Sequence, residues 1–275
     1  MSTGASTKAT PKARRSLTGR IASHASGLCL LAVLLIAWEL SVRLGWVVSA
    51  NWPALSQVLA NVVAGLADGS WWEVFGGTLW RMSAGYTLAC VVGILLGTGL
   101  AVSDWFHRTV YPTVELLRPL PVVAIVPPLI LLLGVDDALK ITVVAFACTF
   151  PVITSTVTGI KAVDQISLDV ARTFRVPRLR QIYRIQIPSA LPYIFAGMRV
   201  SLAMALIVTV IAEMIAGSGG VGYFVVSMQY AMRASDMYAA IILLSLLGYI
   251  LNRGFLMLES RIIRWSRQSQ TDTDT

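Results

Sequence analysis

The chain has 275 residues, of which 56% are hydrophobic and 13% are charged, and its 22 Lys and Arg residues against 14 Asp and Glu residues give a net charge of +8. Soluble domains are about 25% charged and about 45–50% apolar, so this chain has too little charge to cover the surface of a soluble domain. The composition excludes most cytosolic enzymes, nucleic-acid binders and disordered chains, and it leaves a protein that is largely embedded in lipid.

The chain begins with a polar, basic stretch, and residues 1–25 are predicted to form a disordered cytoplasmic tail. An apolar run follows from 27 to about 45, in which Glu39 and Arg43 stand four residues apart and predict a local ion pair. The Arg14-Arg15 pair ahead of this run resembles part of a cleaved signal sequence. Because two charges interrupt the end of the run, we expect it to remain in the chain as a first membrane span.

Five further membrane spans are predicted along the chain. The uncharged runs 82–103 and 141–160 are each long enough for a spanning helix, which needs about 20 mainly apolar residues. Between them, the run 119–135 holds four prolines, so we expect its helix to be kinked or to begin late. Two more spans are predicted around 200–212 and 237–252, each extended by mixed flanks. With the N-terminal run, the sequence predicts six spans.

The basic residues fit six spans with both termini in the cytoplasm. Lys and Arg are frequent in the N-terminal tail, in the segment between the fourth and fifth spans, and after the sixth span. The only basic residues in the loops 46–77, 136–140 and 217–236 are Lys140 and Arg233. An odd number of spans would place one of the basic clusters outside, against the positive-inside rule.

Small residues recur at every fourth position of the second predicted span, at Gly85, Ala89, Gly93, Gly97 and Ala101. Residues with this spacing lie on one face of a helix and let another backbone approach closely. The stripe therefore predicts tight helix packing, within the subunit or across a dimer.

A glycine-rich stretch follows the fifth predicted span. Gly217, Gly219 and Gly222 match the spacing of a dinucleotide fingerprint, but that fingerprint requires a preceding strand in a soluble sheet, and a membrane span precedes it here. With Gly220, these glycines instead predict a flexible outer connection or gate. Glu213 lies just before them inside the span, and an intramembrane carboxylate is by default a functional-site hypothesis. Two roles stay open for it: a residue of the translocation path or outer gate, or a structural hydrogen-bonding residue.

The sequence offers little for catalysis. Its two histidines, His24 and His107, have no carboxylate pair or cysteine nearby, and its three cysteines lie far apart in apolar runs, where they are typical of packing residues. A membrane-embedded enzyme would need clustered polar residues at one depth. The sequence has no G-x-x-x-x-G-K-[ST] loop for a nucleotide phosphate, so any ATP that drives the protein is hydrolysed by another subunit. We expect no catalytic residue, metal site or bound cofactor in this chain.

The segment 161–192 is too polar to cross a membrane, yet it keeps apolar residues among its arginines. This pattern predicts two short amphipathic helices on the cytoplasmic face, broken around Val176-Pro177, because proline suits the first turn of a helix. Such a surface lies on lipid or docks a partner, and the residues alone favour neither.

The same segment resembles the cytoplasmic EAA loop of binding-protein-dependent ABC importer permeases, whose pattern is E-A-A-x-x-x-G-x9-I-x-L-P. Asp169, Val170 and Ala171 stand at its first three positions, Arg175 stands at its glycine, and Ile185-Gln186-Ile187-Pro188 stands at its end. The departure at Arg175 loses a residue that turns freely, although Pro177 can supply the break instead.

The resemblance extends over about residues 50–265. It is strongest to the nitrate/sulfonate/taurine branch, through the stretches NWPALSQVL, LRPLPVVAIVPPLILLLGV, ALPYIFAGMRVSLAMA and VIAEMIAGSGGVGY. It implies the type I ABC importer permease fold, an all-α membrane protein with six transmembrane helices. The implied permease domain covers 26–265, with the coupling loop at 161–189 between spans four and five and a cytoplasmic tail at 266–275.

The resemblance also implies partners and a cargo. It implies a homodimer in the bacterial inner membrane that binds two ABC ATPase subunits, with ATP and Mg on the ATPases, and that receives solute from an extracytoplasmic binding protein. The implied cargo is a small anion such as an aliphatic sulfonate, taurine or nitrate. A permease for a pyrimidine-type vitamin precursor and an ATP-independent secondary transporter are the alternatives. The residues that the resemblance assigns to the ATPase contact are Asp169, Ala171, Arg172, Thr173, Arg175, Pro177 and Pro188.

Overall fold

The computed structural model describes residues 17–47, 49 and 51–263, and these residues form helices and no strand. The predicted tail at 266–275 and most of the tail at 1–25 lie outside the described residues, although the first helix begins at Leu17, inside the predicted tail. The helices are α1 (Leu17–Arg43), α2 (Leu55–Ala67), α3 (Ser70–Val102), α4 (Asp104–Leu117), α5 (Val122–Leu133), α6 (Asp137–Lys161), α7 (Gln165–Thr173), α8 (Arg178–Gln181), the π-helical turn η1 (Ile182–Gln186), α9 (Ile187–Ala216), α10 (Val221–Tyr230) and α11 (Ala234–Ile262).

Within the described residues, four helices are long and apolar enough to cross a membrane, and a bent pair would make a fifth. The four are α3, α6, α11 and the continuous helix that α8, η1 and α9 form over Arg178–Ala216, and the bent pair is α4 with α5. The sequence predicts six spans, and by this measure the described residues supply four, or five with the bent pair. The first predicted span lies in α1, which has 27 residues and is not among these helices.

The third predicted span, over 119–135, begins late, which is one of its two expected forms, because α5 begins at Val122. The chain bends by 100° between α4 and α5, and α5 has only 12 residues. At 1.5 Å per residue α5 is about 18 Å long, shorter than a hydrocarbon core of about 30 Å. The prolines cause the break, because Pro119 and Pro121 have no N–H for a helical hydrogen bond and Pro121 takes an extended conformation before α5.

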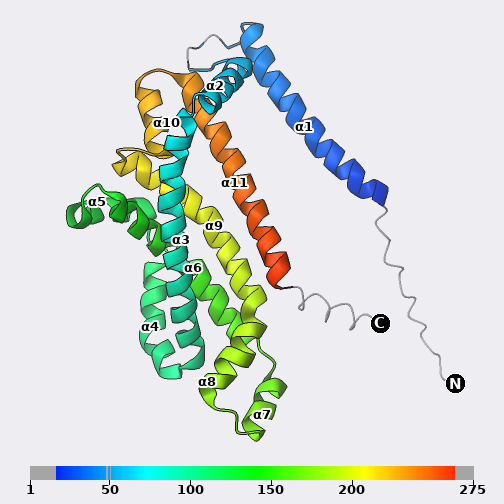
Figure 1. The fold of residues 1–275 in the computed structure, drawn as a ribbon, viewed down its shortest axis with the longest axis vertical. Helices are drawn as coiled ribbons and strands as arrows, with labels where there is room; N and C mark the ends of the chain where they lie inside the picture. Colours follow the sequence, from blue (N-terminus) through cyan, green and yellow to red (C-terminus); the bar gives the residue numbers. More distant parts are fainter. Residues whose placement is uncertain (1–16, 48, 50, 264–275) are drawn as a thin grey trace, which may run out of the picture.

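The core of the bundle is α6, which packs between α3 and α9 (Figure 1). The predicted stripe of small residues lies on this interface. A Cβ atom at Gly85 would lie 2.7 Å from Val144 Cβ of α6, and one at Gly93 would lie 2.7 Å from Val152 Cβ. The stripe therefore brings two backbones of the same subunit together, which confirms the first of its two predicted roles.

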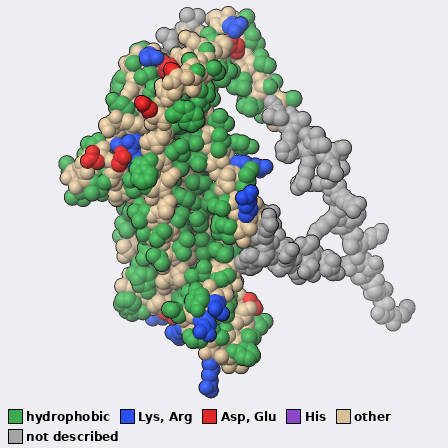
Figure 2. Space-filling model, in the orientation of Figure 1, with side chains coloured by type: hydrophobic (Ala, Val, Ile, Leu, Met, Phe, Trp, Pro, Cys, Tyr) green, Lys and Arg blue, Asp and Glu red, His purple; other side chains and the backbone are tan. Residues whose placement is uncertain are grey.

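The bundle has two distinct ends. In Figure 1, α2 and α10 lie at one end, the α10 end, and α7 and α8 lie at the other, the α7 end. Helix α1 meets the bundle at the α10 end, where the Trp38 ring lies 5.6 Å from that of Tyr238, and then slants away. The predicted ion pair in α1 is present, with Arg43 Nε 2.6 Å from Glu39 Oε1. Figure 2 shows a largely hydrophobic face between the ends and a group of Lys and Arg side chains at the α7 end.

Candidate functional site

Glu213 lies near the C-terminal end of α9 and is completely buried. Its two carboxylate oxygens lie 3.0 and 2.9 Å from the hydroxyl of Thr78 on α3, which donates its single proton to one of them at a time. Arg81 Nη1 donates to Glu213 Oε1 at 2.9 Å, and the backbone N–H of Gly222 donates to Oε2 at 3.0 Å. Glu213 has no basic residue nearby in the sequence, but it pairs with Arg81 of another helix.

Two more charged residues complete this group. Arg81 Nε donates to Asp137 Oδ1 of α6 at 2.6 Å, and the ammonium of Lys140 lies 4.0 Å from the same oxygen. Lys140 is fully buried and donates to the carbonyl of Val135 at 3.3 Å. We call Arg81, Asp137, Lys140 and Glu213 the charge cluster. It holds two cations and two carboxylates, so it is electrically neutral, and it joins the three central helices near the α10 end.

The predicted glycine gate lies directly on the charge cluster. The backbone N–H of Val221 donates to Thr78 Oγ1 at 2.9 Å, and Arg81 Nη1 donates to the carbonyl of Gly219 at 3.3 Å. Together with the bond from Gly222 to Glu213, these contacts hold the loop closely against α3 and α9. In this conformation the loop is held in place by these three hydrogen bonds.

Three of the four glycines are needed for this close packing. A Cβ at Gly220 would lie 2.2 Å from Glu213 Oε1, and the φ of Gly220 is +96°, where glycine is strongly favoured. A Cβ at Gly217 or Gly222 would lie within 2.2 Å of a backbone carbonyl oxygen of α9. Gly219 has open space around it, so packing would allow a side chain at this position.

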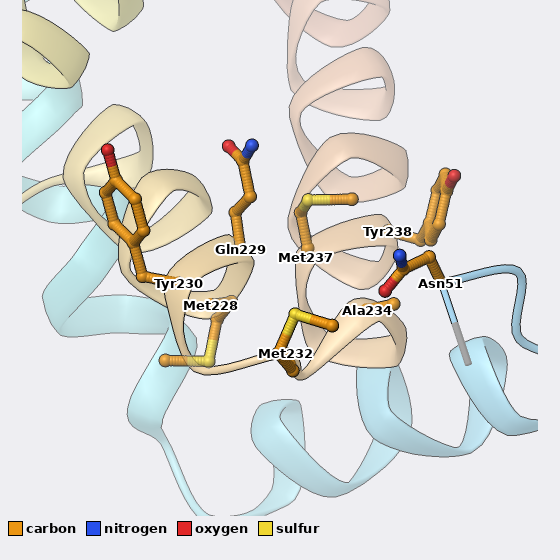
Figure 3. Close-up of a pocket in the computed structure, with 8 residues that line it drawn as sticks. All are labelled: Asn51, Met228, Gln229, Tyr230, Met232, Ala234, Met237 and Tyr238. Atoms are coloured by element: carbon orange, nitrogen blue, oxygen red, sulfur yellow. The ribbon is translucent and has the colours of Figure 1, made fainter.

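A pocket of about 600 Å³ lies at the same end of the molecule, between α10 and α11 (Figure 3). Gln229 and Tyr230 line it from α10, and Met237 and Tyr238 line it from α11. Tyr230 is 84% exposed. The pocket therefore presents thioether, phenol and amide groups on an open surface.

At the α7 end, the predicted break around Val176-Pro177 lies between α7 and α8. Asp164 caps the start of α7 by accepting from the backbone N–H groups of Ile166 and Ser167. The end of α7 is closed by a bond from the N–H of Val176 to the carbonyl of Ala171, at 2.9 Å. Pro177 then stands immediately before α8, as its N-cap.

The turn between α7 and α8 needs Arg175 in a left-handed conformation, with φ of +50°. This is the position where the EAA pattern has glycine, and a non-glycine residue there costs roughly 1–2 kcal/mol. The expectation that Pro177 alone supplies the break was therefore incomplete, because the chain makes the glycine-type turn without the glycine.

The second predicted helix is not a separate one. α8 and η1 continue without interruption into α9, so residues 178–216 form one helix. The π-helical turn lies just before Pro188, whose missing N–H cannot bond the carbonyl of Arg184 and so favours a local change in helix geometry. The helix thus connects the α7 end to Glu213 directly.

α7 has one buried and one exposed apolar face. Leu168 and Ala171 are buried, whereas Ile166, Val170 and Phe174 are exposed by 72%, 51% and 78%. These three residues are spaced by four, so they lie on one side of the helix. This spacing of four can be read in the sequence, but the EAA pattern does not include it.

The residues that the resemblance assigned to the ATPase contact lie in different environments. Ala171 is buried within the chain. Asp169 and Arg172 are exposed but pair with each other at 2.9 Å. Thr173, Arg175 and Pro177 are exposed, and Pro188 is half-buried at the start of α9.

Other predictions concern catalysis and metals. Over the described part of the chain, no group of three His, Cys, Asp or Glu side chains could hold a metal ion. Cys90 and Cys148 are buried, as expected of packing residues, and Cys29 is exposed. His107 stacks on Tyr111 with ring centroids 4.5 Å apart. These residues show no arrangement for acid–base or nucleophilic chemistry.

Comparisons with known proteins place this architecture among transport proteins. The family model described as "Binding-protein-dependent transport system inner membrane component" matches residues 89–264. The chain is 29% identical over 242 residues to the putative aliphatic sulfonates transport permease protein SsuC of Bacillus subtilis, covering 87% of each chain. It is 28% identical to the nitrate import permease protein NrtB of Synechocystis, covering 85% of this chain and 87% of that one.

Two further similarities extend this set. The chain is 26% identical to the formylaminopyrimidine transport permease protein ThiX of Halalkalibacterium halodurans, covering 86% of this chain and 94% of that one. Its fold is similar to that of a chain in inward-facing crystals of the MetNI methionine ABC transporter, with a TM-score of 0.62 and 17% identity. That match covers 69% of this chain and 94% of the MetNI chain.

Proposed function

The chain belongs to the family of binding-protein-dependent transport system inner membrane components, and from this premise we propose how it works as the permease subunit of an ABC importer. Its partners are an ABC ATPase and a solute-binding protein, and it is a transport subunit rather than an enzyme. We propose that two copies form a homodimer, and that ATP and Mg bind to the ATPase subunits alone.

The exposed face of α7 carries the proposal for ATPase docking. Ile166, Val170 and Phe174 form an apolar stripe, which we call the coupling stripe. The same two short helices, α7 and α8, carry exposed arginines at Arg172, Arg178 and Arg180. An apolar centre with a charged rim is typical of a protein interface. A lipid-surface helix would need its apolar face at bilayer depth, whereas α7 lies beyond the ends of α6 and α9 (Figure 1).

This docking site fixes the proposed orientation. If the α7 end is cytoplasmic, the charge cluster and the pocket between α10 and α11 face outward. α1 then runs outward from Leu17, and α11 runs inward to Ile262. Both termini are thus cytoplasmic, in agreement with the excess of Lys and Arg in the terminal regions.

The charge cluster is the proposed outer gate. The continuous helix from Arg178 to Glu213 spans 36 residues, about 54 Å at 1.5 Å per residue, and links the coupling region to the cluster. Movement of α9 when the ATPases close would change the distance between Glu213 and Arg81. The glycine loop is bound to both residues, so it would move with them, which is a rigid-body type of alternation.

The proposed cargo is a small anion of the aliphatic sulfonate or nitrate type, because SsuC and NrtB are named for those solutes. The basic residues of the charge cluster are paired with carboxylates, which supports the view that the binding protein selects the cargo. ThiX favours a formylaminopyrimidine as the second candidate. Screening the cognate binding protein with both ligand classes by thermal shift separates them.

Co-purification tests the docking proposal. Val170→Glu places a charge in the middle of the coupling stripe and is expected to lower recovery of the ATPase with the tagged permease at least tenfold, while the permease still inserts. Tyr230→Glu is the matched control, since it adds the same charge at an exposed residue of the opposite end. Equal ATPase recovery with both variants would refute docking at α7. Ala171→Glu is a poorer test, because the buried position would disturb the segment itself.

A further inference from the structure

A groove runs between α9 and α11. Its cavity volume is about 510 Å³. Leu202 and Leu206 of α9 line it, together with Gly248 and Leu251 of α11. Gly248 keeps the groove open, because it puts no side chain into the space beside Leu206. Ile207 and Tyr249 at the edges are exposed by 59% and 66%, so the groove opens onto the apolar outer surface.

Arg199 closes one end of the groove. It also lines a second cavity, of about 330 Å³, together with Arg253, Glu259 and Ser260. Arg199 Nη2 donates to Glu259 Oε2, but Arg199 Nε is buried and has no acceptor among the described residues. Arg253 is exposed and forms no ion pair within the described part of the chain. Two guanidinium groups thus face one carboxylate, which leaves a positive charge and an unused donor.

The two arginines mark the same depth in the membrane. Arg199 interrupts the apolar part of α9, between the uncharged runs 185–198 and 200–212, and Arg253 directly follows the uncharged run 237–252 of α11. Both line the cavity of about 330 Å³, so the two charges lie at one level of the bundle. The groove extends from them along the apolar part, towards the middle of the bilayer.

We propose that this groove binds an anionic phospholipid, with the phosphate at Arg199 and Arg253 and one acyl chain beside Leu206 and Gly248. Arginine binds phosphate through charge-assisted hydrogen bonds, and basic pockets between membrane helices bind anionic headgroups. The orientation proposed above places this lipid in the cytoplasmic leaflet. The site uses neither the coupling stripe nor the charge cluster, so it is independent of the proposed gate.

Lipid is favoured over an aliphatic sulfonate or a second copy of the chain for two reasons. The residues at the groove edges are exposed apolar side chains at bilayer depth, where lipid surrounds the protein. The charge is positive at one end only, which matches a molecule with an anionic head and an apolar tail.

Native mass spectrometry of the permease–ATPase complex tests the proposal. The delipidated complex is titrated with phosphatidylglycerol or with phosphatidylcholine of the same acyl chains. We expect preferential retention of one phosphatidylglycerol per permease chain, and occupancy about tenfold lower in Arg253→Gln, from the loss of a charge-assisted hydrogen bond. Arg108→Gln, the same charge loss at an exposed residue of α4, is the control and is expected to bind as the wild type does.

A second variant tests the acyl-chain part of the groove. Gly248→Leu fills the space but keeps both arginines, and it is expected to lower phosphatidylglycerol occupancy to a similar extent. Equal retention of the two lipids, or an equal loss with Arg108→Gln, would overturn the proposal. Displacement of bound lipid by 1-octanesulfonate would assign the groove to cargo instead. Disulfide-linked dimers of Ala203→Cys, in a background with Cys29→Ser, would assign it to a second copy.

Discussion

Replacing Glu213 by Gln tests the charge cluster with little change in shape. The wild-type carboxylate is fully buried and accepts from Arg81, Thr78 and the backbone of Gly222. In the glutamine variant, Arg81 loses its hydrogen bond to a charged carboxylate, which is worth about 1.5–3 kcal/mol. The NH₂ group of the amide also faces one of the remaining donors, which costs about 1 kcal/mol more. Arg81 keeps its bond to Asp137, so the larger penalty of a fully uncompensated buried charge does not apply.

The expected result is a loss of about 2–4 kcal/mol in the free energy of unfolding, measured by denaturant titration in mixed micelles. Glu73→Gln is the matched control, because Glu73 is an exposed residue of α3 near the same end, and a change within about 0.5 kcal/mol is expected. In a double-mutant cycle, Arg81→Gln with Glu213→Gln should be less destabilising than the sum of the single changes by about 1–3 kcal/mol. Additive effects, or a wild-type stability for Glu213→Gln, would refute the reasoning.

Three further predictions concern backbone geometry. Arg175→Gly relieves the left-handed strain and is expected to change the free energy of unfolding by between zero and about +1 kcal/mol. Arg175→Val should lower the free energy of unfolding by about 1–2 kcal/mol, measured by unfolding in the same micelles. A wild-type stability for the valine variant would contradict the assigned turn. Gly220→Ala is expected to abolish transport in an uptake assay, because its Cβ would meet the buried carboxylate of Glu213. Gly219→Ala is the control and should transport normally. Equal activity of the two variants would argue against a packed loop. Gly93→Ala should cost about 1–3 kcal/mol by overpacking α3 against α6, and Gly76→Ala, which has open space around it, should cost less than about 0.5 kcal/mol.

Local chemistry allowed several features to be predicted from the sequence. The break near Val176-Pro177 and the ion pair of Glu39 with Arg43 depend on residues within a few positions of each other. The stripe that includes Gly85 and Gly93 follows from helical spacing alone. Long apolar runs likewise indicated the spanning helices, because a lipid environment requires them.

Features that depend on tertiary packing were missed. The partner of Glu213 is Arg81, and 132 residues separate them, so no pattern in the span itself pointed to the pair. Ala171 matched the EAA motif, but only the packing of α7 shows that it is buried and that Phe174 is exposed. The prolines predicted the late start of α5, but the 100° bend between α4 and α5 was not predicted, because a break in the sequence does not fix the direction that the chain takes after it.

The most direct test of the account is uptake by proteoliposomes that contain the permease, its ATPase and its binding protein. The cargo is a labelled aliphatic sulfonate, and uptake is measured with ATP and with an ion gradient, for the wild type and for Val170→Glu. We expect uptake that requires ATP and the binding protein, and background uptake for Val170→Glu despite normal insertion. Uptake that runs on an ion gradient without ATP, or ATP-driven uptake that is unchanged by Val170→Glu, would contradict the account.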